Sequence, residues 1–328
     1  MQKVCWILAI DIGGHWLKGG LVDPITGDKL FCQQVESGAR SGARKVAENF
    51  CSFAAKLLAI AKEKNMRVVS IGYGTPGTVN AETGIVSGSC GNIAGWIGYD
   101  LPSEVRRQFG LPVFSLNDVR CFTLCEATFG AGVGMTDFGV WAFGTGVGGG
   151  LWLLGKLYLG VRYSACELGH LPIDPLGPSC SQGHRGCLEG FTSTEAIKTL
   201  WTTCYNSRGN LETSYHEVKK PIVVDIFKHA EANDPLCRKV TDMIAFRIAK
   251  GIGIVANILD LQIGIIGGKV AGSEQFFADE VQKQVMPHLL DSQHDFRIVR
   301  AKYHDQGAML GAAVYAHQRY LKSLGTPD

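Results

Sequence analysis

Val4-Cys-Trp-Ile-Leu-Ala-Ile10 is a continuous apolar run that leads directly into Asp11-Ile-Gly-Gly14. Such a run, ending in two glycines, predicts a buried strand that enters a tight turn. The segment Gly19-Gly-Leu-Val-Asp23 then predicts the returning strand of a hairpin. The first hairpin of the chain therefore places an acidic residue, Asp11, where its first strand ends.

The same pattern of strand, glycine turn and strand recurs near residue 144. It consists of residues 138–143, the turn Gly144-Thr-Gly-Val-Gly-Gly149, and residues 150–154. A pattern that occurs twice suggests two related halves, and strands that alternate with helices indicate an α/β fold. We expect further strands at 68–73, 113–116 and 263–266, and helices at 43–64, 101–109, 119–129, 193–204, 234–259 and 306–321.

The composition is that of an ordinary globular enzyme. Of 328 residues, 46% are hydrophobic and 19% are charged, and this length suits two domains. The net charge of +2 gives no argument for a nucleic-acid partner or an acidic membrane surface. The longest apolar region, residues 138–161, is broken by glycines and Lys156, which argues against a membrane span. We therefore expect neither nucleic acid nor membrane as a partner.

Cysteine usage predicts a cytoplasmic protein. The eleven cysteines are an odd number and most are scattered singly, which is unlike a disulfide framework. The apolar residues 6–10 are too few for a signal peptide and run directly into Asp11. A reducing compartment follows from both observations.

Two glycine turns are candidate phosphate sites. In Asp11-Ile-Gly-Gly14-His15-Trp-Leu-Lys18, backbone N–H groups can approach a phosphate and Asp11 can hold a metal ion, although a plain hairpin turn is the alternative. Gly144 to Gly149 matches G-x-G-x-x-G, but an apolar strand follows where a dinucleotide site needs a helix. Residues 150–156 fail as a P-loop because Leu157 replaces Ser or Thr. A glycine-rich hairpin that presents N–H groups to phosphates is the better interpretation.

Asn117-Asp118 follows a predicted strand and precedes a predicted helix. One interpretation is a helix N-cap, a position that Asp favours. The other is a general base that accepts the proton of a hydroxyl nucleophile, at the strand end where α/β sheets bind ligands.

The segment from Glu167 to Glu189 combines metal ligands with polar groups. His170, Cys180 and Cys187 lie within eighteen residues of a Gly- and Pro-rich loop, which fits a small tetrahedral metal knuckle. Acidic residues bracket the loop on both sides, which a purely structural zinc loop does not need. The segment therefore suggests a loop that also holds polar groups for a ligand.

An ordered set of short motifs runs through the chain essentially from end to end. These are Asp11-x-Gly-Gly, Gly74-x-Pro-Gly77, Asn92-x-x-Gly-Trp96, Asn117-Asp118, Gly144-Thr-Gly146, Glu167-x-Gly-His170, the Cys180/Cys187 loop, Gly267-Gly268 and Gly311-Ala-Ala313. In this set the chain resembles the ROK family of sugar kinases and sugar-responsive repressors. The resemblance implies the actin-like ATPase (ribonuclease H-like) fold, with two α/β domains around a central cleft. We expect a smaller domain at 1–117 plus 307–328, and a larger one at 118–306 that carries the zinc-type loop.

The resemblance also implies ATP- and Mg²⁺-dependent phosphorylation of a hexose or N-acetylhexosamine, usually at the 6-hydroxyl, by a homodimer. By position, Asp118 resembles the catalytic base. The sugar ligands would be Asn92, Asn117, Glu167, His170 and Glu189. The ATP and magnesium contacts would be Asp11, Gly13, Gly14, His15, Lys18, Gly144, Thr145, Gly146, Gly267 and Gly268. Allose kinases are somewhat more similar than other branches, but glucose, fructose, N-acetylmannosamine and N-acetylglucosamine remain open.

The chain departs from the family pattern at a few positions. Gln182 stands where the zinc loop has its middle cysteine, so the expected Zn²⁺ ligands are His170, Cys180 and Cys187, with His184 or water as the fourth. His15 replaces the usual Thr, and Lys269 replaces a frequent Gly near the nucleotide. A catalytically weak sugar-binding protein is therefore one alternative. A repressor is another, but Asp11 leaves no room before it for a DNA-binding module.

Overall fold

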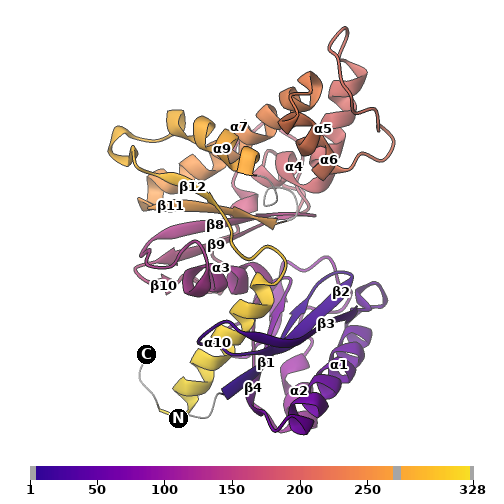
Figure 1. Cartoon of the computed structure of the whole chain (residues 1–328), viewed down its shortest axis with the longest axis vertical. Helices are drawn as coiled ribbons and strands as arrows, with labels where there is room; N and C mark the ends of the chain where they lie inside the picture. Colours follow the sequence, from indigo (N-terminus) through magenta and orange to yellow (C-terminus); the bar gives the residue numbers. More distant parts are fainter. Residues whose placement is uncertain (1–4, 269–274, 326–328) are drawn as a thin grey trace. The chain divides into compact units, whose positions relative to one another are not determined.

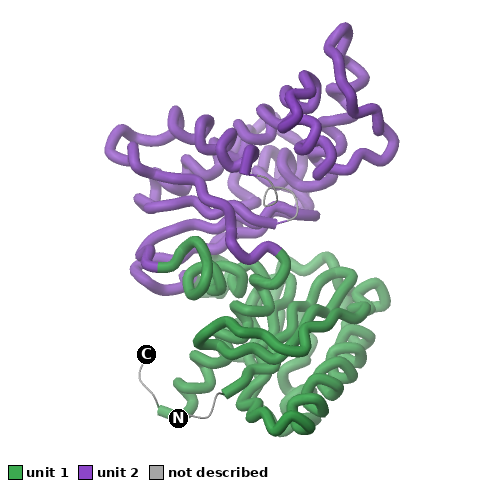
Figure 2. Tube along the Cα trace, viewed as in Figure 1, with its two compact units in different colours: residues 1–133, 159–165, 305–328 green, residues 134–158, 166–304 purple. Residues whose placement is uncertain are grey.

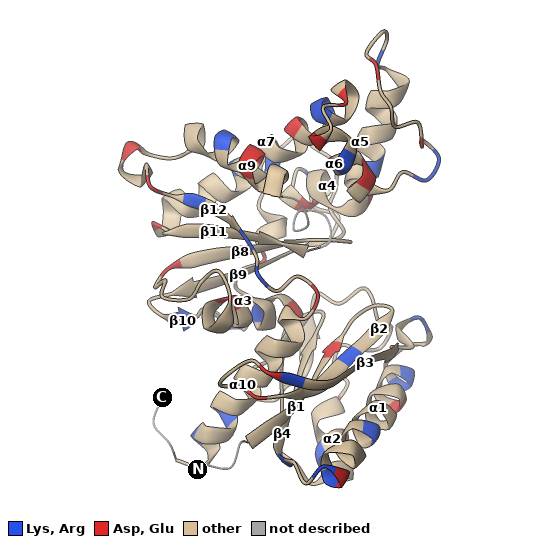
Figure 3. Cartoon of the chain, in the orientation of Figure 1, with Lys and Arg blue, Asp and Glu red and all other residues tan. Residues whose placement is uncertain are grey.

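The computed structural model describes residues 5–268 and 275–325, so Lys269 lies outside the described residues. The chain divides into two compact units (Figure 2). Unit 1 comprises Met1–Val133, Leu159–Ala165 and Asp305–Asp328, and unit 2 comprises Gly134–Tyr158 and Cys166–His304. Acidic and basic side chains are interspersed over both units, in keeping with the small net charge (Figure 3).

Unit 1 is built on a five-stranded sheet of order β3-β2-β1-β4-β7. The strands β1 (Cys5–Ile12), β2 (Trp16–Val22) and β3 (Lys29–Glu36) form an antiparallel meander. The strands β4 (Arg67–Thr75) and β7 (Val113–Asn117) run parallel to β1. The predicted hairpin at Asp11 is thus confirmed as β1 and β2.

Helices cover both faces of this sheet (Figure 1). Alternation along β4 turns Tyr73 toward Phe50 of α1 (Ala43–Glu63), with ring centres 5.3 Å apart. Gly72 faces α10 (Gly307–Ser323), because a Cβ atom at Gly72 would lie 2.3 Å from the Ala312 carbonyl oxygen. The remaining elements of unit 1 are η1 (Ala39–Ser41), β5 (Thr78–Val79), β6 (Val86–Gly88), α2 (Leu101–Phe109) and α3 (Asp118–Phe129).

Unit 2 repeats this design with a second five-stranded sheet, of order β10-β9-β8-β11-β12. The strands β8 (Phe138–Phe143), β9 (Val147–Leu153) and β10 (Lys156–Leu157) are antiparallel neighbours. The strands β11 (Ile263–Gly267) and β12 (Arg297–Arg300) run parallel to β8. Three antiparallel strands followed by two parallel ones therefore occur in both units, which confirms the two related halves expected from the doubled hairpin.

The helices of unit 2 pack around the long helix α7 (Pro235–Leu259), whose residues from Val240 to Ala256 contribute much of the buried core. The others are η2 (Leu168–His170), α4 (Leu188–Thr192), α5 (Thr194–Asn206), α6 (Val223–Glu231), α9 (Gln275–Val285), η3 (Met286–His288) and η4 (Asp291–Gln293). Within residues 5–268 and 275–325, no helix combines the length and apolar character needed to cross a membrane.

The domain boundary expected at residue 118 would have placed helix α3 in the larger domain, but the observed boundary lies after Val133. The helix lies in unit 1, together with residues 159–165. The reason is its packing against α10, where a Cβ atom at Gly311 would lie 1.6 Å from the Cys121 carbonyl oxygen. The carboxyl-terminal helix α10 begins at Gly307, one residue after the start predicted from the sequence.

Candidate active site

The expected sugar and magnesium residues of unit 1 gather at one edge of its sheet. Strands β1, β4 and β7 are parallel, and Asp11, Gly74 and Leu116 lie side by side in register. Asn117 and Asp118 follow Leu116 directly, so they extend from the same edge as Asp11. Gly74 lies directly against the start of α3, because a Cβ atom there would be 3.5 Å from the Asp118 Cα atom, an ordinary packing distance.

Asn117, and not Asp118, is the N-cap of α3. Its Oδ1 accepts hydrogen bonds from the backbone N–H groups of Val119 (3.0 Å) and Arg120 (3.1 Å). Its Nδ2 donates to the Gly77 carbonyl oxygen (3.1 Å) and to Asp118 Oδ1 (2.9 Å). The amide of Asn117 thus satisfies the start of the helix and also orients the neighbouring carboxylate.

Asp118 is the first residue of α3, and its side chain remains partly exposed. Its Oδ1 also accepts a hydrogen bond from the backbone N–H of Val119 (2.9 Å). Bonds to one oxygen and the positive end of the helix dipole favour the charged carboxylate. An ionised, oriented and accessible carboxylate is the form that a general base requires.

Asp11 and Asp118 act on the same buried thiol. Burial, followed by the negative charges of Asp118 and Asp11, raises the pKa of Cys121 well above its ordinary value. Because Asp11 ends β1 and Asp118 follows β7 at the same edge of the sheet, both carboxylates extend from the edge where a divalent cation and phosphate oxygens would bind. Asp11 is partly exposed, as such a role requires.

The turn after Asp11 is open to solvent. Gly13 closes it with a bond from its N–H to the Trp16 carbonyl oxygen (2.9 Å). Gly14 and His15 are exposed, and His15 Nε2 lies 3.3 Å from an Arg40 guanidinium nitrogen. Lys18 is partly exposed, with its Nζ 3.7 Å from the Asp305 carboxylate. The turn therefore has free space beside Gly14. The side chains of His15 and Lys18, and that of the neighbouring Arg40, surround it with basic groups.

Asn92 lies in the exposed loop that follows β6. Burial raises the pKa of the nearby Cys90 thiol, backbone N–H groups of Asn92 and Ile93 lower it, and the charge of Asp118 raises it further. Both the Asn92 loop and the Asp118 carboxylate therefore affect the pKa of the Cys90 thiol. This places the Asn92 loop near Asp118 within unit 1.

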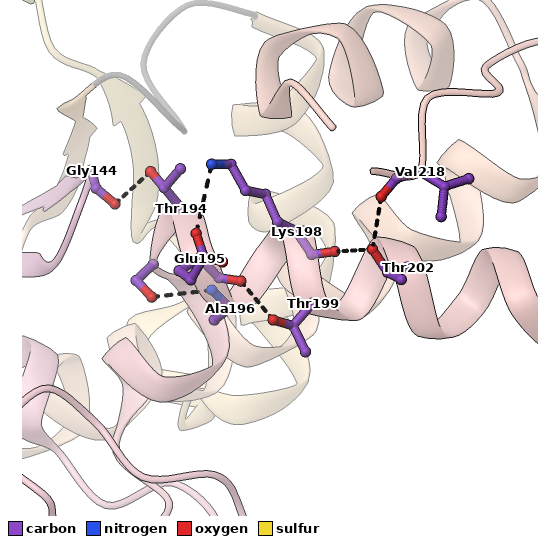
Figure 4. A network of polar contacts seen from close by, with 9 residues as sticks. Gly144, Thr194, Glu195, Ala196, Lys198, Thr199, Thr202 and Val218 are labelled. Carbon is purple, nitrogen blue, oxygen red and sulfur yellow. Dashed lines mark hydrogen bonds and ion pairs between the residues drawn. The ribbon is translucent and has the colours of Figure 1, made fainter. Parts of the chain in front are cut away.

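In unit 2 the Gly144–Gly146 turn is fixed to the start of α5. The N–H of Gly144 donates to the Gly146 carbonyl oxygen (2.9 Å). The Gly144 carbonyl oxygen accepts from both the N–H and the Oγ1 of Thr194, each at 2.8 Å (Figure 4). Thr145 at the tip is exposed. The turn is thus held by bonds to its carbonyl groups while its tip stays accessible.

Gly267 and Gly268 lie beside this turn. Gly267 pairs with Ala142 in the sheet, and a Cβ atom at Gly268 would lie 2.2 Å from the Phe143 carbonyl oxygen. Gly268 also has a positive φ of 86°, which side chains rarely adopt. Both requirements explain a glycine at this position next to Gly144.

The Glu167–His170 segment packs against the same hairpin. It forms a short 3-10 turn in which the N–H of His170 donates to the Glu167 carbonyl oxygen (3.0 Å). A Cβ atom at Gly169 would lie 2.0 Å from the Val147 carbonyl oxygen. The glycine therefore allows this turn, with exposed Glu167, to sit directly on the first residue of β9.

A cavity of about 790 Å³ adjoins the Gly144–Gly146 turn. Thr145 borders it together with one face of α5 and the segment before α6. Lys198 contributes a cation, 3.6 Å from Glu195, and Thr202 Oγ1 donates to the Val218 carbonyl oxygen at 3.4 Å (Figure 4). These residues could not be recognised from the sequence, since nothing local distinguishes them from a solvated helix face. The further lining residues are Thr194, Thr199, Thr203 and the segment 219–224.

His170, Cys180 and Cys187 form a cluster suited to a metal ion. One ligand atom from each lies within 4.8 Å of the others. Zn–S bonds of about 2.3 Å and Zn–N bonds of about 2.0–2.1 Å place tetrahedral ligand atoms roughly 3.5–3.8 Å apart, so small shifts would admit zinc. Within the described residues, His170 Nδ1 is buried without a hydrogen-bond partner, as expected of a nitrogen kept for another role. The donor set therefore fits zinc.

The thiols of this cluster are buried. Burial, and then the neighbouring Cys180, raise the pKa of Cys187 to about 11. Such a thiol stays protonated at neutral pH, and binding of a metal ion would displace its proton. His184 is exposed, with its ring centre 6.3 Å from that of His170.

The structure thus collects the predicted site residues into two groups. Unit 1 holds Asp11, Gly13, Gly14, His15, Lys18, Asn92, Asn117 and Asp118, and unit 2 holds Gly144, Thr145, Gly146, Glu167, His170, Cys180, His184, Cys187, Glu189, Gly267 and Gly268.

Comparison with known proteins gives a family match over nearly the whole chain. Residues 7–319 match the model of the ROK family. The chain belongs to the ROK family. As a ROK protein it has the actin-like ATPase fold, and it resembles the crystal structure of a ROK family glucokinase from Streptomyces griseus in complex with glucose and AMPPNP. The TM-score is 0.81 at 26% identity, covering 95% of this chain and 99% of that one.

Curated ROK relatives include kinases and a repressor. The chain is 28% identical to the glucokinase of Thermotoga maritima over 95% of this chain and 98% of that protein. It is 29% identical to an N-acetyl-D-glucosamine kinase of Yersinia pseudotuberculosis over 74% of this chain and 79% of that protein. It is also 26% identical to the putative xylose repressor of a Caldicellulosiruptor species, over 94% of this chain and 77% of that protein.

Proposed function

We propose that this ROK protein is a sugar kinase that transfers the γ-phosphoryl group of ATP to a hydroxyl of a hexose or N-acetylhexosamine. The 6-hydroxyl is the proposed acceptor. The observation that carries the proposal is the carboxylate of Asp118, which is partly exposed at the end of β7 and oriented by Asn117. Phosphoryl transfer needs positioning and neutralisation of charge more than covalent help, and the two groups of site residues provide for both.

Unit 1 supplies the base and the acidic metal contact. Asp118 would accept the proton of the sugar hydroxyl while the hydroxyl oxygen forms a bond to the γ-phosphorus of ATP. The bond from that phosphorus to the bridging oxygen breaks, and ADP leaves. Asp11, partly exposed at the same sheet edge, would hold Mg²⁺ or its waters. When bound, Mg²⁺ neutralises charge on the phosphate oxygens. Gly13, Gly14, His15 and Lys18 would contact the phosphates from the turn that follows.

Unit 2 supplies the nucleotide contacts. The accessible tip of the Gly144–Gly146 turn would bind phosphate oxygens through backbone N–H groups. The cavity of about 790 Å³ shares Thr145 with this turn and is large enough for a nucleoside. Its Lys198 adds a positive charge beside the phosphates. Gly267 and Gly268, packed on Phe143, would complete the contact.

The sugar would be recognised by amide, carboxylate and imidazole groups. These groups hydrogen-bond hydroxyls, and a sugar that lacks one hydroxyl leaves a polar group unpaired, which penalises the wrong substrate. The names of the relatives, glucokinase and N-acetyl-D-glucosamine kinase, support hexoses and their N-acetylated amines as the class. The proposed ligands are Asn92, Glu167 and His170. Asn117 makes four internal hydrogen bonds with its amide, and buried Glu189 bonds Val147 and Ser181, so these two would hold the surrounding loops in place.

A coupled assay of ADP release, with Mg²⁺ and a panel of hexoses and N-acetylhexosamines, tests this function. Turnover of at least one sugar is expected. Asp118→Asn should lower kcat by roughly 10²–10⁴-fold, the typical contribution of a general base. Sugar binding should persist, because the amide oxygen of Asn can still accept the Val119 bond. The matched control is Asp295→Asn, at an exposed position of unit 2. Background turnover of every sugar would contradict the proposal.

A catalytically weak sugar-binding protein is the second candidate. It is favoured by His15, which lies beside Arg40 in the turn where the family pattern has Thr. This candidate predicts that sugar raises the thermal unfolding midpoint while no ADP is released. Sugar-dependent ADP release would exclude it.

A further inference from the structure

The metal cluster of this chain lacks one ligand of the set that a structural zinc ion takes. Such ions are almost always held by four protein ligands in a tetrahedron. Only His170, Cys180 and Cys187 meet in the described residues. Gln182 follows Cys180 in the loop, but an amide oxygen is a poor partner for zinc beside thiolates.

The fold of the loop brings His184 close to His170. The N–H of Gly183 donates to the Cys180 carbonyl oxygen (2.9 Å), and the N–H of Cys180 donates to the His184 carbonyl oxygen (2.8 Å). Gly183, with a φ of 80°, permits the reversal. Because of this tight turn, residue 184 lies opposite Cys180. The neighbouring residues Ser179 and Arg185 form an antiparallel β-bridge.

The two imidazoles are close to the separation that one metal ion would set. Their ring centres lie 6.3 Å apart, with the planes at 85°. With Zn–N bonds of about 2.0–2.1 Å, two imidazoles on one tetrahedral ion have ring centres roughly 5–5.5 Å apart. The ring centres would have to approach each other by about 1 Å, and His184 is exposed, so its side chain is not held by packing. Fixing one exposed side chain costs at most about 2 kcal/mol, which is small beside the affinity of structural zinc.

We propose that His184 is the fourth ligand, so that this chain holds zinc with two cysteines and two histidines. Each thiolate carries one negative charge, so zinc with two thiolates is neutral, whereas a third cysteine would make the site anionic. A neutral site suits this location, because the buried Glu189 carboxylate already accepts two hydrogen bonds from Ser181, the residue next to Cys180. The inference concerns metal binding alone and holds whether or not the protein is a kinase.

Cobalt(II) titration of the full-length, metal-free protein tests the inference without any activity measurement. Cobalt replaces zinc in such sites, absorbs strongly in the visible when tetrahedral, and shows a thiolate charge-transfer band in the near ultraviolet. The wild type should show both features. His184→Ala should raise the dissociation constant at least 10-fold and weaken the visible bands, since even residues behind the ligands affect affinity 10–100-fold. Gln182→Ala, in the same turn, is the matched control and should change neither.

Gln182→Cys provides the second arm of the test. A third thiolate should increase the charge-transfer band by about half, since three thiolates replace two. In this background His184→Ala should no longer matter, which also shows that the loop tolerates the alanine. The inference is overturned if the wild type gives no thiolate band, if His184→Ala binds cobalt like the wild type, or if Gln182→Ala weakens binding as much as His184→Ala does.

Discussion

Glu189 accepts a hydrogen bond from the backbone N–H of Val147 at 3.0 Å and so ties α4 to the first residue of β9. Its other carboxylate oxygen accepts from the N–H (3.0 Å) and the Oγ (2.5 Å) of Ser181, which follows Cys180 in the metal loop. Burial raises the pKa of Glu189, but these hydrogen bonds and the charge of His170 outweigh burial and lower it. One buried carboxylate thus joins the metal loop to the Gly144–Gly149 hairpin.

Glu189→Gln should therefore disturb both loops. An amide offers one acceptor oxygen, so its NH₂ group must face a donor on Ser181 or on Val147. Losing a charged hydrogen bond in this way costs about 1.5–3 kcal/mol. We expect a lower thermal midpoint and at least a 10-fold fall in kcat/KM for ATP. Ser181→Ala removes only the Oγ donor and should have a smaller effect on both. Equal effects of the two substitutions would refute the linking role of Glu189.

Gly311 sets the distance between α10 and α3. A Cβ atom there would lie 1.6 Å from the Cys121 carbonyl oxygen, which a helix backbone cannot avoid by a side-chain rotation. Helix propensity alone favours Gly311→Ala by about 1 kcal/mol. Overpacking by the added methyl group destabilises the fold by about 1–3 kcal/mol or more. Because the contact is so short, we expect this cost to exceed the gain in helix propensity. We expect a lower urea midpoint, with kcat also reduced because Asp118 begins the displaced helix. Gly88→Ala, whose Cβ atom would meet open space, is the control. An unchanged midpoint for Gly311→Ala would contradict this packing argument.

The sequence predicted the inner strands and long helices well, because their patterns are local. Strand β1 is apolar over most of its length since helices cover both faces of its sheet. Strand β3 was missed because it is an edge strand whose residues are mostly exposed or half-exposed. Strand β12 was missed because four residues are too few for a period to show. Helices α4, α6 and α9 were also missed.

Of the candidate site, the motif residues could be predicted and the contacts between distant segments could not. Asn117-Asp118 was found at a strand end, but the hydrogen bond from Asn117 Nδ2 to the Gly77 carbonyl oxygen joins residues forty positions apart. The bond between Glu189 and Val147 spans forty-two positions. The cavity beside Thr145 unites α5 with residues 218–224, which are separate in the sequence. Such groupings arise only from folding.

Asp234 stabilises the start of α7 in a way that depends on pH. Its Oδ1 accepts from the N–H of Cys237 (2.9 Å), and its Oδ2 accepts from both the N–H and the Oγ of Ser214, the latter at 2.9 Å. Burial raises the pKa of Asp234, but the hydrogen bonds from Cys237 and Ser214 together outweigh it and lower the pKa to about 2. A carboxyl whose pKa is depressed on folding stabilises the protein above its unfolded pKa of about 3.9, and this contribution is lost as pH falls toward 2.

Asp234→Asn should therefore cost stability at neutral pH and progressively less below pH 4. Asn remains a good N-cap, so the loss reflects the charge, on the order of 1–3 kcal/mol at pH 7. Urea unfolding followed by circular dichroism, at pH 7 and at pH 3, measures the difference between wild type and variant. The gap between their midpoints should narrow at pH 3, because there the unfolded wild-type chain is largely protonated at this residue. Asp291→Asn, at an exposed position, should show no such dependence. A gap for Asp234→Asn that stays constant from pH 7 to pH 3 would mean that the hydrogen bonds of Asp234 do not depend on its charge.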